Sequence, residues 1–161
     1  MTLKPANYKH RRTNGTSLTG ENGMGLVYAE IELTNEDDLA FNRRGALPEH
    51  EIRRMTVRAL VDSGAWDLVI TEDVRKRLDL PVLGRRTATL ADERQVDVDI
   101  VGPVRIRFQN RATVIMAIVL PNTSEVLLGA YALEGLDAFI DPKRERLLVR
   151  PDDIKKLKRV A

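Results

Sequence analysis

The sequence contains no cysteine, which excludes disulfide bonds, thiolate metal sites and cysteine nucleophiles and fits a reducing compartment. Histidine is scarce as well. His10 and His50 are far apart and in polar surroundings, so neither a zinc site with paired histidines nor a histidine-based catalytic triad has the residues it needs. We therefore expect no metal and no cofactor.

Long apolar runs are also missing. The first residues lack the apolar core of a signal peptide, and no run approaches membrane-spanning length, so we expect a cytoplasmic protein without a membrane partner. Neither sign of charge predominates, because the sequence has 26 Lys and Arg and 24 Asp and Glu. Aromatic residues make up only 4% of the sequence. Nucleic acid is therefore not a favoured partner, although the basic ends, 9–12 and 155–159, keep it open as an alternative.

The length of 161 residues and the apolar fraction of 43% fit one domain with its own core. Residues 1–23 are polar and aperiodic and predict a disordered extension. We assign the domain to residues 24–150. Residues 151–161 are a basic tail in which a short helix could follow Asp152.

Short apolar segments between turn residues predict a mostly β fold with two short helices, which is typical of a barrel or sandwich. Residues 34–51 are expected to form a loop, the phase slip at 53–54 a bulge, and Gly102-Pro103 a break between two strands. One helix is expected at 72–79, capped by Thr71, and the other at 130–136. The expected strands are 26–33, 52–61, 67–70, 86–90, 95–101, 104–108, 112–120, 126–128, 139–140 and 147–149.

Asp62 follows an apolar run and leads directly into a Ser-Gly turn, where desolvation disfavours its ionised form. A carboxyl used as acid and base can be tuned by a second carboxyl, but the chain has no second Asp-Ser/Thr-Gly. A homodimer supplies one, since a two-fold axis places Asp62 against its own copy. One carboxylate then takes a proton from water while the other donates to the scissile carbonyl.

The neighbours of Asp62 have physical reasons for their positions. Gly64 permits a turn that a side chain opposes, and the Ser63 hydroxyl can tie the turn to backbone, including backbone across a two-fold axis. The alternative for Asp62 is a turn aspartate that hydrogen-bonds to nearby backbone N–H groups.

Three segments together resemble the retropepsin-like aspartic proteases, and more closely their small bacterial single-domain members. They are Leu60-Val61-Asp62-Ser63-Gly64-Ala65, then Leu68-Val69-Ile70, then Leu127-Leu128-Gly129 with a helix and a hairpin behind it. The resemblance covers residues 24–149. It implies a closed, β-barrel-like acid protease fold, the retropepsin-like single lobe, active as a homodimer that cleaves peptide bonds with two copies of Asp62 and a water. It also implies that Leu127, Leu128 and Gly129 pack beneath the turn of Asp62, Ser63, Gly64 and Ala65.

The resemblance further implies that the hairpin 86–101 is a flap over the substrate. Its tip would be Leu90, Ala91, Asp92, Glu93 and Arg94, which lacks the glycines common in retroviral members. The acids of this hairpin, Asp92, Asp97 and Asp99, are interpreted as a solvent face rather than a calcium site.

Many retroviral members pair an acidic residue, two places after the motif glycine, with an arginine after the second glycine. Those positions are Trp66 and Ala130 here, so something apolar replaces the ion pair, and Trp66 fills either a substrate pocket or the dimer interface. Two functions remain open: an aspartic-type endopeptidase acting on peptides or proteins, and a non-catalytic dimeric β module that binds extended peptides in the same cleft.

Overall fold

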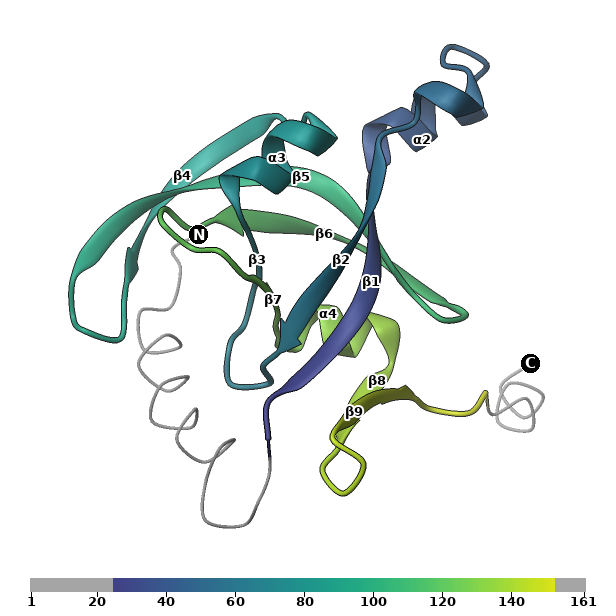
Figure 1. The fold of residues 1–161 in the computed structure, drawn as a ribbon. Helices are drawn as coiled ribbons and strands as arrows, with labels where there is room; N and C mark the ends of the chain where they lie inside the picture. Colours follow the sequence, from purple (N-terminus) through teal and green to yellow (C-terminus); the bar gives the residue numbers. More distant parts are fainter. Residues whose placement is uncertain (1–24, 153–161) are drawn as a thin grey trace, which may run out of the picture.

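The computed structural model describes residues 25–152, and its main feature is a closed ring of six strands (Figure 1). Neighbouring strands follow the order β1-β2-β7-β3-β6-β5-β4, and an additional pairing of β1 with β5 closes the ring and leaves β4 outside it. The mostly β, closed-barrel prediction is confirmed. The strands are β1 (Val27–Asn35), β2 (Arg54–Val61), β3 (Leu68–Ile70), β4 (Val82–Thr89), β5 (Gln95–Phe108), β6 (Arg111–Val119) and β7 (Val126–Leu128).

Alternating side chains explain how the ring acquires a core. Along β2, the main apolar cluster includes or contacts Met55, Val57, Ala59 and Val61. Thr56 and Arg58, which lie between them, are exposed. This is the period of two that a half-buried strand requires. The same cluster takes in Leu78 of α3 (Glu72–Leu78), so that helix is anchored to the ring through its apolar face.

The predicted helices are confirmed. The Thr71 hydroxyl accepts a hydrogen bond from the Val74 N–H at 3.1 Å and starts α3, which ends at Asp79 in a left-handed conformation. Helix α4 (Ala130–Leu136) follows β7, and the hairpin of β8 (Ala138–Asp141) and β9 (Arg146–Val149) closes the described chain. No helix within residues 25–152 combines the length and the apolar composition needed to cross a membrane.

The loop predicted for residues 34–51 is wrong. Strand β1 runs on to Asn35, and the segment then forms α2 (Glu36–Arg43) and the 3₁₀ turn η1 (Glu49–Glu51). The Asn35 side chain caps α2 by accepting from the Asp38 N–H, and the first turn of α2 carries three acidic residues, which suits a helix N-terminus. Figure 1 shows α2 beyond the far end of the β1–β2 ribbon.

Two expected irregularities are also wrong. Pairing between β1 and β2 is unbroken from Arg54 to Val61, so the phase slip at 53–54 marks the start of the strand and not a bulge. Gly102-Pro103 does not separate two strands, because β5 continues through it and the register shift between Val101 and Val104 absorbs it. The expected disorder of residues 1–23 and the helix after Asp152 lie outside the described residues.

Candidate active site

Asp62 lies where β2 ends between β1 and β7, and the turn of residues 62–65, the Asp62 turn, folds around its carboxylate. The residue is only 3% exposed, and its Oδ1 accepts a hydrogen bond from the Gly64 N–H at 2.9 Å. The Asp62 N–H donates to the Leu128 carbonyl at 3.0 Å, and the Ala65 N–H donates to the Asp62 carbonyl at 3.1 Å. The carboxylate is thus buried and oriented by the turn that carries it.

Strand β7 and the start of α4 contact this turn and the end of β2 through backbone hydrogen bonds. Leu60 and Val61 pair in parallel register with Leu127 and Leu128. The Ala130 N–H then donates to the Ala65 carbonyl at 2.7 Å, so α4 begins directly against the turn. The structure therefore brings the two predicted segments, 62–65 and 127–129, into contact.

Trp66 and Tyr131 form an aromatic pair beside the turn. Their ring centroids are 5.3 Å apart with the planes tilted by 41°, and the Tyr131 N–H donates to the Trp66 carbonyl at 3.1 Å. Tyr131 remains 43% exposed, so the pair presents apolar surface next to Asp62. At Trp66, one of the two positions expected to lack the ion pair, the side chain therefore makes an aromatic contact with Tyr131, the residue after Ala130.

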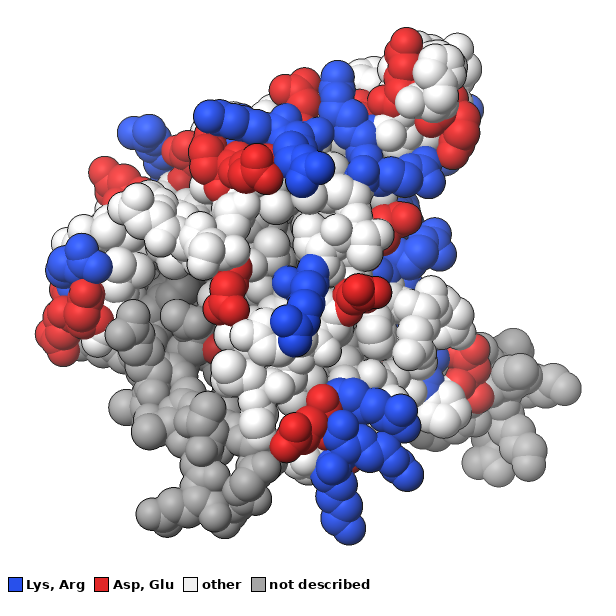
Figure 2. Space-filling model, viewed as in Figure 1, with Lys and Arg blue, Asp and Glu red and all other residues white. Residues whose placement is uncertain are grey.

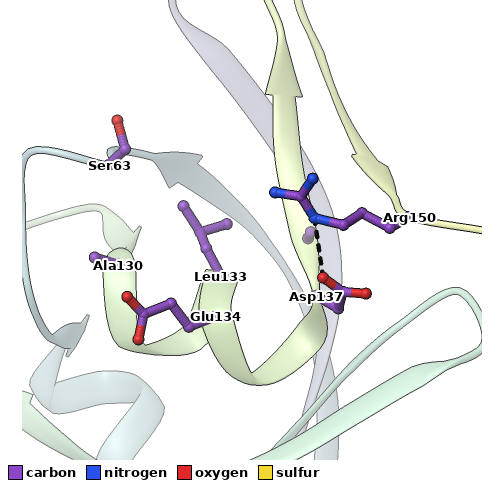
Figure 3. A pocket seen from close by; sticks show the side chains of 7 residues that line it. Ser63, Ala130, Leu133, Glu134, Asp137 and Arg150 are labelled. Carbon is purple, nitrogen blue, oxygen red and sulfur yellow. Dashed lines mark ion pairs between the residues drawn. The ribbon is translucent and has the colours of Figure 1, made fainter. Parts of the chain in front are cut away.

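Ser63 is exposed and lines an open pocket of about 360 Å³ between the Asp62 turn and α4. Figure 3 shows Arg150, which follows β9, reaching across to Asp137 with an ion pair of 3.0 Å, while Glu134 extends on the other side. The pocket is lined by Ser63, Ala130, Leu133, Glu134, Asp137, Ala138 and Arg150. The predicted turn residue Ser63 thus faces a surface and not the core.

A second, smaller apolar cluster lies on the other side of the sheet from the main core. Leu60 of β2 and Val69 of β3 belong to it, whereas their neighbours Val61, Leu68 and Ile70 belong to the main core. The hairpin of β4 and β5 covers this smaller cluster with Ala88 and Val98. Its buried members are Leu60, Val69, Ala88, Val98, Ile118 and Leu127.

The tip of the β4–β5 hairpin is a tight turn in which Glu93 takes the left-handed conformation, with φ of 71°. The Leu90 N–H donates to the Arg94 carbonyl at 2.8 Å, and Arg94 pairs with Asp92 at 2.7 Å. Leu90 and Ala91 are half-buried and the other three tip residues are exposed. This hairpin lies at the edge of the sheet, since β4 pairs only with β5 among the described strands.

Asp67, which the sequence predicts only as the start of a strand, lies two residues beyond the Asp62 turn. It is half-buried, and burial raises its pKa above the usual range, against a smaller lowering by the charge of Arg86. The signal available in the sequence was a second acid five positions after Asp62, at the entry of an apolar strand.

Charged side chains among the described residues are mixed in sign over the face that Figure 2 shows. Within residues 25–152, no three His, Asp or Glu side chains lie close enough together to hold a metal ion.

Comparison with known proteins places the geometry in context. A family model described as gag-polyprotein putative aspartyl protease matches residues 49–135, which include the Asp62 turn and Gly129. Among curated proteins, none matches this sequence.

Similar solved structures include the retroviral protease-like domain of Ddi1 from Leishmania major, with 16% identity, 78% of this chain and 90% of that chain covered, and a TM-score of 0.48. EIAV protease complexed with the inhibitor HBY-793 has 18% identity, covers 76% of this chain and 99% of that chain, and has a TM-score of 0.45. A retropepsin-like aspartic protease from Rickettsia conorii has 14% identity, 76% and 79% coverage, and a TM-score of 0.44.

Proposed function

Because this chain belongs to the gag-polyprotein putative aspartyl protease family, we propose that it is an aspartic-type endopeptidase that works as a homodimer. The observation that carries the proposal is the environment of Asp62. The residue is 3% exposed, its carboxylate accepts from the Gly64 N–H, and its turn contacts β7 and α4. Burying an ionisable acid costs free energy, so a buried acid held in one orientation on a turn at the end of a strand supports a chemical role.

In the homodimer, the second copy of Asp62 supplies the second carboxyl. Two carboxyls close together cannot both ionise, so the pair holds one proton between them. The ionised carboxylate takes a proton from water as the water oxygen attacks the scissile carbonyl carbon, and the protonated carboxyl donates to the carbonyl oxygen. Collapse of the tetrahedral intermediate breaks the C–N bond, and the amine leaves with a proton from the pair. No covalent intermediate with the protein is formed.

Exposed groups around the turn support contact with a second copy. Ser63 is exposed next to Asp62, and the Trp66–Tyr131 pair presents apolar surface on the same loop. If a two-fold axis passes beside Asp62, as the proposal requires, Ser63 and the Trp66–Tyr131 pair would lie in the interface or beside the substrate site.

The substrate we propose is an extended peptide. Among the described strands β4 has one unpaired edge, and a peptide strand can add its backbone hydrogen bonds to such an edge. Partly exposed apolar side chains that pack against the smaller cluster, Tyr28, Val96, Ile100 and Leu120, would offer apolar contact to substrate side chains.

The test is hydrolysis of a peptide library across pH by the wild type and by Asp62→Asn. We expect cleavage that Asp62→Asn abolishes, with Asp73→Asn as the matched control, because Asp73 is exposed on α3. Sedimentation at the same concentrations should show a dimer. Cleavage that survives in Asp62→Asn, or cleavage by a strict monomer, contradicts the proposal. Peptide binding without cleavage at any pH favours the non-catalytic peptide-binding module.

A further inference from the structure

The open pocket of about 360 Å³ beside the Asp62 turn combines an apolar part with charged borders. Ala130, Leu133 and Ala138 supply the apolar part, and Leu133 is only 7% exposed. Figure 3 shows Glu134 on one side of the pocket and Arg150 on the other. Apolar contact surface surrounded by polar and charged groups is the usual composition of a protein–protein interface.

Both charged borders can bind a further group. Glu134 is exposed, and its side chain makes no ion pair with any residue in the range 25–152. Arg150 pairs with Asp137 through Nε at 3.0 Å, and its side chain is 62% exposed. In Figure 3 the two terminal guanidinium nitrogens of Arg150 point away from Asp137. Water satisfies such exposed groups in a single chain, so the arrangement of the two charges, and not their exposure, indicates the partner.

An acid on one side of a pocket and a base on the other form a surface that a second copy of itself complements. About a two-fold axis, every contact between two different residues occurs twice, with the roles of the two chains exchanged. If Glu134 contacts the partner's Arg150, then Arg150 contacts the partner's Glu134. One docking geometry therefore forms two ion pairs.

The place of the pocket in the fold also favours a second copy over another partner. Ser63, which follows Asp62 directly, lines the pocket. A two-fold axis that brings two Asp62 carboxyls together passes beside this turn, so the pocket lies beside the same axis. The second copy then covers the pocket.

We propose that this pocket is a docking surface for a second copy of the chain, fixed by two reciprocal ion pairs between Glu134 and the partner's Arg150. Asp137 holds the guanidinium by Nε while the terminal nitrogens donate to the partner's carboxylate, which the forked geometry of arginine permits. Complementary charges of this kind set the register of an interface, here that of the two Asp62 turns. The inference rests on the proposed function, because it takes the two-fold axis to pass beside Asp62.

The experiment reverses each charge in turn and measures the Kd of the dimer by sedimentation. Glu134→Arg places like charges opposite each other twice and should raise the Kd at least about tenfold. The second variant combines Arg150→Glu with Asp137→Asn, since the new carboxylate would otherwise face Asp137 in its own chain. Asn accepts the left-handed conformation of position 137, with φ of 51°, and this variant should also raise the Kd at least about tenfold.

An equimolar mixture of the two variants tests the reciprocity. In the mixed dimer, the arginine introduced at position 134 faces the glutamate introduced at position 150, and the unchanged Glu134 faces the unchanged Arg150. Both contacts are again attractive, so the mixture should dimerise with nearly the wild-type Kd. A mixture that dissociates as readily as its two components overturns the proposal.

A second charged pair supplies the matched control. Asp73 and Arg77 are exposed on α3, with 3.8 Å between their charged groups, and Figure 1 shows α3 away from α4. Asp73→Arg and Arg77→Glu, alone or mixed, should leave the Kd of the dimer unchanged. Circular dichroism confirms that each variant is folded before its Kd is compared. Equal weakening by the control variants assigns the effect to overall charge and overturns the specific pairs.

The outcomes separate this inference from the catalytic proposal. A dimer that cleaves peptides and keeps its Kd in both reversed variants supports the peptidase and contradicts this docking surface. Reversed variants that dimerise only when mixed, without cleavage of any peptide by the wild type, support the docking surface and contradict the peptidase. A wild type that stays monomeric at every concentration contradicts both.

Discussion

Gly129 packs so closely against Asp67 that a Cβ on the glycine would lie 2.5 Å from the Asp67 carbonyl oxygen. The carbonyl of Ala65 would lie 2.8 Å from the same atom. Both contacts are with backbone, which cannot rotate away as a side chain can. The close approach lets the Ala130 and Tyr131 N–H groups reach the loop, so the absence of a side chain at 129 sets the position of the Asp62 turn.

Gly129→Ala should therefore displace the turn. We expect a loss of about 3 kcal/mol in the free energy of unfolding, at the upper end for overpacking, together with loss of peptide cleavage. Gly84→Ala is the control, since its nearest contact would be the Ile100 side chain at 3.7 Å. Urea unfolding measures both variants, and wild-type stability in Gly129→Ala would contradict the packing argument.

Trp66 is the only tryptophan, so its fluorescence reports directly on the aromatic pair. If the pair lies in the dimer interface, dilution should shift the emission to longer wavelength, with the midpoint that sedimentation gives for dissociation. Trp66→Ala should weaken the dimer by about 2 kcal/mol, as for a central aromatic contact. Phe41→Ala, 53% exposed on α2, should leave dimerisation unchanged. An emission maximum that does not change when the dimer dissociates would assign Trp66 to the substrate site instead.

The ion pair between Glu36 and Arg105 joins α2 to the barrel, with an Nε–Oε2 distance of 2.7 Å and a second bond of 2.9 Å. The hydrogen bond from Arg105 is the main cause that lowers the pKa of Glu36. A lowered pKa means that the pair stabilises the fold above the pKa of unfolded glutamate and that this contribution disappears as pH falls through the folded pKa.

Arg105→Gln should consequently lower the free energy of unfolding by about 1 kcal/mol at pH 7, the upper end for a pair of this exposure. The difference from the wild type should shrink in acid, once Glu36 is protonated. Urea unfolding at pH 7 and in acid measures this, with Arg107→Gln on the same strand as control. A difference that stays constant with pH would rule out the charge of Glu36 as the cause.

The Thr71 cap gives a local prediction. Thr71→Ala removes the acceptor for the Val74 N–H and should lower the free energy of unfolding by about 1 kcal/mol. Thr56→Ala, exposed on β2, is the control and should have a smaller effect. Thermal unfolding compares the two, and equal effects would show that the hydroxyl of Thr71 contributes nothing as a cap.

Local signals made several elements predictable. Thr71 followed by Glu72 and Asp73 has the sequence of a helix start, and the alternation from Met55 to Val61 has the period of a half-buried strand. Each signal depends on residues within a few positions of one another, so the element follows from the sequence alone.

Other elements depend on distant residues and were missed. Helix α2 has no apolar stripe, and it is attached through Glu36 to Arg105 and through the Asn35 side chain to the Leu78 carbonyl at 2.9 Å. Asp67 gained its raised pKa from burial inside the folded chain and its opposing charge from Arg86. Neither environment exists within a short window of sequence.

The sequence by itself indicated a turn at Asp62, because Ser and Gly after an apolar strand favour one, and it determined most of the strands through their period. Tertiary structure decided what surrounds the turn. The pairing of β2 with β7 brings Asp62 to Leu128, and the closure of β1 on β5 completes the ring. Such contacts join residues tens of positions apart, and only the cooperative packing of the whole core selects them over alternatives that local preference allows equally.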